Sequence, residues 1–153
     1  MNFQTMSKQR KFVLIAAIIG LIAMFLPWIN LGLFGSVNGM HSEGIIVFLC
    51  FLGAAGVCLA GDQTKTLDKT FWFIALACGA IASLINVINF FRAIDALGFF
   101  GIGFYLAILA SLATLGAAYM FRSPTDSIKG GFDSLKKDIE EKTKSNTPPT
   151  PPQ

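Results

Sequence analysis

Four long apolar runs, separated by short polar clusters, occupy most of the chain between residues 12 and 121. They extend over about 12–29, 44–61, 71–91 and 100–121. Ala, Leu and Ile dominate these runs, and the alternation of apolar and polar positions that is typical of half-buried strands or of barrel segments does not occur. A helix needs about 20 mostly apolar residues to cross a bilayer. The pattern therefore predicts four transmembrane helices.

The composition supports this interpretation. The 153 residues are 54% hydrophobic and only 14% charged, whereas about 25% of the residues of a soluble domain are charged. We therefore predict an all-α polytopic membrane protein, with a four-transmembrane-helix bundle over residues 12–121. Between the ends of the bundle the charged residues fall into three short clusters, and they are Glu43, Asp62, Lys65, Asp68, Lys69, Arg92 and Asp95.

The basic residues predict the orientation of the bundle. Lys and Arg are enriched in cytoplasmic loops, and eleven of the twelve lie in the N-terminal segment 1–11, in the second loop or in the tail 122–153. The exception is Arg92, in the third loop. We expect a multi-pass protein of the cell membrane, of the bacterial cytoplasmic type, with both termini in the cytoplasm. The first run is longer than the apolar part of a signal peptide, so we expect an uncleaved span.

The first loop, predicted to face outward, carries a turn signal. Asn38-Gly39 favours a tight hairpin, which would cap the bundle between about residues 30 and 43. His41 and Glu43 are the ionisable residues of this loop. A structural zinc site needs four ligands and a catalytic site three. Because the chain has a single His, we expect a solvated polar pair here and no metal site.

The four runs contain no Asp, Glu, Lys, Arg or His, which disfavours a proton-coupled transporter. The polar residues of the third run, Ser83, Asn86 and Asn89, have three open interpretations. They could line a pore, form interhelical hydrogen bonds, or reach the outer headgroups. Ala75, Gly79 and Ser83 form a series of small residues suited to close helix packing, within one chain or between two.

Catalytic and cofactor chemistry has no support in the sequence. Cys50, Cys58 and Cys78 all fall inside apolar runs and are expected to act as small buried hydrophobes. Phosphate-loop and CxxC motifs are absent, and so are basic patches with interleaved aromatic residues. We therefore expect no enzymatic activity, no cofactor and no nucleic-acid partner.

The tail 122–153 has its own pattern. Ser123, Pro124 and Asp126 resemble a helix start, although Gly130-Gly131 disfavours a helix at that point. A single apolar stripe predicts a short amphipathic helix over about 131–144, followed by a disordered Pro-rich end. We expect the stripe to dock on the inner membrane surface or on a protein partner, with Lys136, Lys137 and Glu140 toward water. Its members are Ile128, Phe132, Leu135 and Ile139.

From Leu26-Pro27-Trp28 through the segment 131–137, the chain resembles the small uncharacterised four-helix integral membrane proteins of bacteria. The resemblance implies a fold and a location and no activity. The functional expectation is a structural or accessory subunit, in contact with the lipid bilayer and with a membrane-protein partner or a second copy of itself. The alternative is a small channel or carrier for a neutral or apolar solute, lined by the polar residues of the third run.

Overall fold

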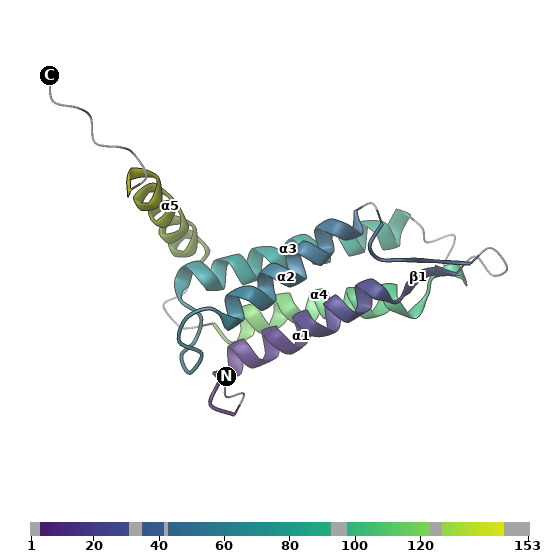
Figure 1. Ribbon diagram of the computed structural model, residues 1–153, viewed down its shortest axis with the longest axis horizontal. Coiled ribbons are helices and arrows are strands. Elements are labelled where there is room, and N and C mark those ends of the chain that lie inside the picture. Colours follow the sequence, from purple (N-terminus) through teal and green to yellow (C-terminus); the bar gives the residue numbers. More distant parts are fainter. Residues whose placement is uncertain (1–3, 31–34, 42, 93–97, 123–126, 146–153) are drawn as a thin grey trace, which may run out of the picture.

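The computed structural model describes residues 4–30, 35–41, 43–92, 98–122 and 127–145 of the chain. The described part is mainly helical, and helices α1 to α4 form a bundle in which α1 and α3 each pack against both α2 and α4 (Figure 1). The elements are α1 (Lys8–Phe25), β1 (Pro27–Asn30), β2 (Ser36–Asn38), α2 (Gly44–Leu59), α3 (Lys69–Arg92), α4 (Ile102–Met120) and α5 (Ile128–Ser145).

The bundle has two unlike ends. We call the end with β1, β2 and the start of α2 the hairpin end. The opposite end, where α1 begins, α2 and α4 end and α5 is attached, is called the tail end (Figure 1).

In the described part of the chain, two of the four bundle helices are long and apolar enough to cross a membrane. They are α3 and α4, each of which contains an 18-residue apolar segment, with mean hydropathies of 2.2 and 1.7. Helix α2 is apolar but has 16 residues. Helix α1 has 18 residues and begins with Lys8, Arg10 and Lys11. The four apolar runs thus all form helices, but two of these helices fall short of the predicted length or apolarity.

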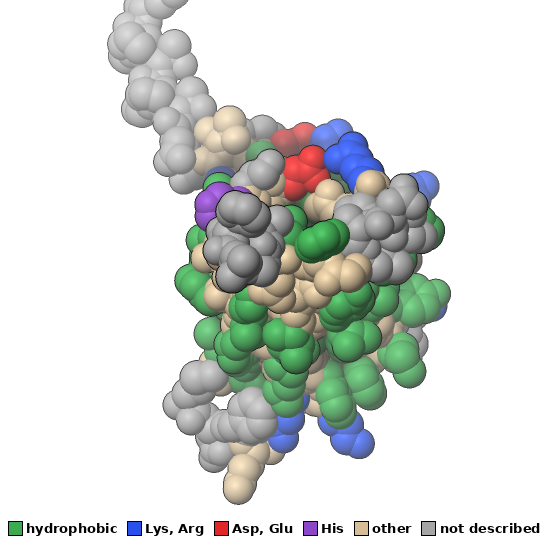
Figure 2. All heavy atoms as spheres, turned by 90° about the vertical axis from the view of Figure 1, so that its right-hand side faces the viewer, with side chains coloured by type: hydrophobic (Ala, Val, Ile, Leu, Met, Phe, Trp, Pro, Cys, Tyr) green, Lys and Arg blue, Asp and Glu red, His purple; other side chains and the backbone are tan. Residues whose placement is uncertain are grey.

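Alanine and glycine lie at many of the helix contacts inside the bundle, beside a few large buried residues such as Trp72, Phe51 and Phe104. Many other large apolar residues lie on its outside. Gly79 of α3 lies so close to α4 that a side-chain Cβ there would be 2.9 Å from the backbone N of Leu115, and Gly20 of α1 faces the ring of Phe51. Figure 2 shows hydrophobic side chains over the flanks of the bundle. Buried alanines include Ala17, Ala54, Ala75, Ala82, Ala107 and Ala118, and exposed large residues include Ile22, Leu49, Leu52, Leu84, Leu109 and Met120.

The predicted hairpin exists, but its turn is elsewhere. β1 and β2 pair antiparallel, with Asn30 opposite Ser36. The connection therefore runs through residues 31–35, of which the structure describes Gly35, at a φ of 99°. Asn38 is instead the last residue of β2, and the N–H of Gly39, which follows it, donates to the carbonyl of Met24 at 2.9 Å. The first predicted span was consequently too long, since α1 ends at Phe25 and 27–30 form a strand.

Helix α5 begins at Ile128, a few residues before the predicted start at about residue 131, and continues through Gly130-Gly131, which was expected to disfavour a helix. The hydroxyl of Ser127 accepts from the N–H of Gly130 at 3.1 Å and so caps the start. Gly131 is needed for contact with α3, because a Cβ there would lie 2.8 Å from Cβ of Phe73. The predicted start signals at Ser123, Pro124 and Asp126 lie outside the described residues.

Candidate functional site

A cavity of about 350 Å³ opens at the hairpin end of the bundle. It is formed by the hairpin, the start of α2, the end of α3 and the start of α4, and its wall is aromatic on one side and polar on the other. The lining residues are Trp28, Ile29, Val37, Asn38, His41, Glu43, Gly44, Asn89, Arg92, Phe100 and Phe104.

The aromatic wall is fixed by a short series of contacts. The indole N–H of Trp28 donates to the carbonyl of Ala23 at 3.0 Å, and its ring lies against Gly39, where a Cβ would not fit. The rings of Trp28 and Phe104 meet edge to face with centroids 5.2 Å apart. Phe100 stacks on Phe104 at 4.4 Å. This wall can accommodate an apolar or aromatic group.

The polar wall contains an ion pair between two helices. Arg92, at the end of α3, lies 3.1 Å from the carboxylate of Glu43, which precedes α2. Both side chains are substantially exposed, so the pair is solvated. His41 lies 3.1 Å from the side-chain oxygen of Asn38. The predicted polar pair at the helix entrance is therefore divided, because Glu43 contacts Arg92 and His41 contacts Asn38.

The three polar residues predicted on the third run have different surroundings. Asn89 lines the cavity. Asn86 is completely buried, and its amide donates at 3.3 Å to the carbonyl of Ala107 and to the hydroxyl of Ser111, both on α4. Ser83 is buried, and neither its hydroxyl nor the side-chain oxygen of Asn86 has a hydrogen-bond partner among the residues that the structure describes. A polar line thus descends from the cavity into the α3–α4 contact.

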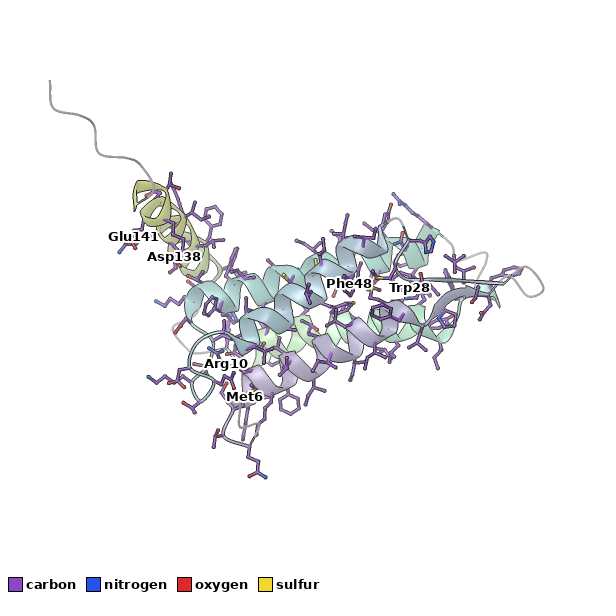
Figure 3. All side chains as sticks on the ribbon, viewed as in Figure 1. Met6, Arg10, Trp28, Phe48, Asp138 and Glu141 are labelled. Carbon is purple, nitrogen blue, oxygen red and sulfur yellow. The ribbon has the colours of Figure 1, made fainter. Side chains whose placement is uncertain are left out.

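Sequence reasoning missed the buried arginine at the tail end. Arg10 is 1% exposed, and its guanidinium donates to the carbonyl of Cys58 at 3.0 Å, to that of Ala60, and to that of Lys65 at 2.9 Å (Figure 3). It therefore satisfies the last carbonyls of α2, where a cation is also favoured by the helix dipole. Its position among the basic residues of the N-terminal segment was used only to predict the orientation of the bundle.

Two further side chains complete this arrangement, which we call the tail-end clamp and define as Gln9, Arg10 and Trp72. The side-chain oxygen of Gln9 accepts from the N–H of Leu67 at 3.0 Å. Its amide and the indole N–H of Trp72 both donate to the carbonyl of Ala118, at 3.4 and 2.8 Å. The clamp therefore connects α1, α3, the α2–α3 loop and the ends of α2 and α4.

The α2–α3 loop also contains a carboxyl group with a perturbed pKa, that of Asp62. Asp62 accepts from the hydroxyl of Thr64 at 2.7 Å and from its N–H at 3.0 Å. These bonds favour the ionised carboxylate, so they lower the pKa of Asp62 below its ordinary value. The group is fully exposed and shapes the loop.

The predicted tail stripe divides between two environments. Leu135 lines a groove between α3 and α5, together with Ile139. The rings of Phe132 and Phe73 of α3 meet edge to face, with centroids 6.2 Å apart. Phe132, Ile128 and Ile139 are nevertheless each more than half exposed. Lys137 lies near Glu141, and Asp138 accepts from the hydroxyl of Thr70 at 3.0 Å.

Reactive groups are sparse in the described part of the chain. Cys50 and Cys58 are buried and Cys78 is partly buried, with the thiols of Cys50 and Cys78 in hydrogen-bond contact between α2 and α3. Within the described ranges, no three His, Cys, Asp or Glu side chains are grouped closely enough to hold a metal ion. Searches against protein families, curated proteins and solved structures found no match to this chain.

Proposed function

We propose that the chain is an integral membrane protein whose four bundle helices cross the bilayer, with the tail end in the cytoplasm. The observation that carries this proposal is the exposure of large apolar side chains on all four helices, together with alanine and glycine at many of the contacts between them. Soluble monomers rarely expose contiguous apolar patches larger than a few hundred Å². Helices in lipid, by contrast, associate through small residues.

The shorter helices are compatible with this placement. Helix α2 spans about 24 Å at 1.5 Å per residue, against a hydrocarbon core of about 30 Å. A short apolar helix is accommodated by local thinning of the bilayer. The cations at the start of α1 lie at the tail end, where Lys65 and Lys69 also lie, as expected for a cytoplasmic face.

Within the membrane, we propose a non-enzymatic role as a structural or accessory subunit of a membrane-protein assembly. The buried polar groups support this role because they connect helices. Gln9, Arg10 and Asn86 donate to backbone carbonyls of other segments, and Trp72 donates from α3 to α4. Such groups are therefore engaged in holding the bundle together.

Reporter fusions test the topology. A reporter fused after Gln153 and one inserted between Ser36 and His41 are expected to give opposite signals, the first cytoplasmic. An exterior signal from the C-terminal fusion contradicts the proposal. The accessory role predicts a membrane protein that co-purifies at constant stoichiometry in mild detergent, and recovery of the chain alone at every expression level contradicts it.

The second candidate is a carrier or channel for a small neutral or apolar solute. It is favoured by the cavity at the hairpin end and by the polar line from Asn89 through Asn86 to Ser83. Purified protein in liposomes separates the two candidates. Solute flux that an Asn89→Leu change abolishes supports the carrier, whereas liposomes no leakier than protein-free controls support the accessory role.

A further inference from the structure

Helix α5 lies on the bundle in an asymmetric manner. It contacts α3 through Gly131, which is buried against Phe73, and through the Thr70–Asp138 hydrogen bond. The apolar stripe lies beside this contact and is only partly covered by it. Phe132 meets Phe73 and Ile139 borders the groove next to α3, yet Ile128, Phe132 and Ile139 are 59%, 56% and 57% exposed. Docking on the bundle thus fixes the position of α5 and leaves its most apolar face open.

The charges around this open face are ordered. With 3.6 residues per turn, Lys129 and Lys136 border the stripe on one side and Lys142 borders it on the other, and all three are exposed. Lys136 and Lys142 lie closer to the stripe than any acidic residue of α5 does, and Lys129 lies about as close as Asp138. A lysine border next to an apolar face is typical of helices that lie in the plane of a bilayer, where the amines reach the headgroups.

The space beside the stripe is also apolar at its base. A groove of about 460 Å³ runs between α3 and α5, with Phe71, Ile74, Leu135 and Ile139 in its wall. The acidic residues at its rim have partners, because Asp138 is bonded to Thr70 and Glu141 lies 3.9 Å from Lys137. The groove suits a hydrocarbon chain whose headgroup lies near Lys142.

From these features we propose that α5 is an in-plane membrane helix that docks on the cytoplasmic leaflet and binds anionic phospholipid. The stripe and the groove take up acyl chains, and Lys129, Lys136 and Lys142 contact the phosphates. The inference rests on the proposed membrane topology. Basic and acidic residues nearly balance over the whole tail, so the attraction to anionic lipid comes from the three amines that border the stripe and is weaker than that of a polybasic cluster.

The test compares two side chains that are both open in the protein. Ile139 and Lys137 are exposed by 57% and 77%, so without lipid a label at either position meets water. Ile139→Cys and Lys137→Cys are prepared in the full chain with Cys50, Cys58 and Cys78 changed to Ala, and an environment-sensitive fluorophore is attached. Each protein is placed in nanodiscs of phosphatidylcholine, with or without phosphatidylglycerol.

We expect blue-shifted emission and several-fold weaker aqueous quenching at position 139, and water-like behaviour at 137. Phosphatidylglycerol should increase the protection at 139, and changing Lys129, Lys136 and Lys142 together to Gln should remove that increase. Equal quenching at both positions overturns the proposal, as does protection at 139 that depends on protein density, which indicates a second copy. Protection at 139 that is unaffected by phosphatidylglycerol overturns the anionic-lipid part. Topology reporters are read separately, so a failure of α5 to dock is distinguishable from a wrong topology.

Discussion

The two ends of the bundle are held together in different ways. At the tail end, a buried guanidinium, a buried amide and a buried indole donate to backbone carbonyls from three other segments. At the hairpin end, the connection between α2 and α3 is an exposed ion pair, and a cavity of about 350 Å³ lies beside it. Both ends have a tryptophan that donates a hydrogen bond. Trp28 bonds to a carbonyl five residues away, whereas Trp72 bonds to a carbonyl of another helix.

The two kinds of contact differ in how much they stabilise the bundle and in how easily they rearrange. A buried donor with several carbonyl partners has one good geometry, and its loss leaves unsatisfied groups that water does not reach. An exposed ion pair contributes about 0 to 1 kcal/mol and can break in solvent. We therefore expect the tail end to be the rigid base of the bundle, and the hairpin end to be the part that can rearrange around a ligand or partner.

The largest expected effect is at Arg10. An Arg10→Met change removes the hydrogen bonds to the carbonyls of Cys58, Ala60 and Lys65, and it should lower the free energy of unfolding by on the order of 3 kcal/mol, since a hydrogen bond to a charged group contributes about 1.5 to 3 kcal/mol. The stability of Arg10→Lys should lie between those of Arg10→Met and the wild type, because an amine cannot donate to three carbonyls with the planar geometry of a guanidinium. Denaturant unfolding in mild detergent measures both.

Lys8→Met is the matched control, since Lys8 is an exposed cation on the same helix. It should change stability by no more than about 0.5 kcal/mol. If Arg10→Met proves as stable as Lys8→Met, the guanidinium does not hold the tail end, and the contrast between the two ends loses its main support.

A pair of tryptophan variants compares the ends directly. Trp72→Phe deletes a bond from α3 to Ala118 of α4, whereas Trp28→Phe deletes one to Ala23, five residues away. Both variants lose a similar ring area, so the difference between their stability losses reports whether the lost hydrogen bond is local or joins two helices. We expect losses of about 2 kcal/mol for Trp72→Phe and about 1 kcal/mol for Trp28→Phe. Thermal unfolding ranks them, and a larger loss at Trp28 would reverse the comparison.

The polar line below the cavity gives the next test. Asn86→Leu removes two interhelical bonds and should cost about 1 kcal/mol, within the range of 0.6 to 2 kcal/mol measured for such bonds in membranes. Ser83→Ala should cost nothing or stabilise slightly, because its hydroxyl has no partner to lose. Equal losses for the two variants would show that Ser83 is engaged, for example by water, and would favour the solute-carrier candidate.

The sequence predicted more of the helices than of the contacts. The apolar runs located α1 to α4 because helices in such runs follow from local composition and period. The sequence could not indicate that Arg10 is buried, because its partners are backbone carbonyls near residues 57–65. Every residue has a backbone carbonyl, so no residue type identifies such a partner. The early start of α5, through Gly130-Gly131, was not predicted for a related reason. Glycine has a low intrinsic helix propensity, but close contact with Phe73 stabilises the helix at this point.

The site shows the same limit. Ser83, Asn86 and Asn89 were identifiable as polar residues in an apolar run, but their different surroundings depend on where α4 and the hairpin lie. The cavity could not be foreseen at all, because its lining comes from β1, β2, the start of α2, the end of α3 and the start of α4. Only the pairing of those distant segments creates it.

The smallest expected effect on stability is at the ion pair of the hairpin end. Arg92 and Glu43 are 66% and 47% exposed, so salt should screen their attraction. A double-mutant cycle of Glu43→Gln and Arg92→Gln should give a coupling energy below about 1 kcal/mol at low salt, falling toward zero at high salt. The loss caused by Arg10→Met should not change with salt, because that guanidinium is buried. A coupling of several kcal/mol that persists at high salt would mean that α2 and α3 are fixed to each other at the hairpin end. In that case both ends of the bundle would be rigid, and the cavity would be a space of constant shape with no capacity to adapt to a solute.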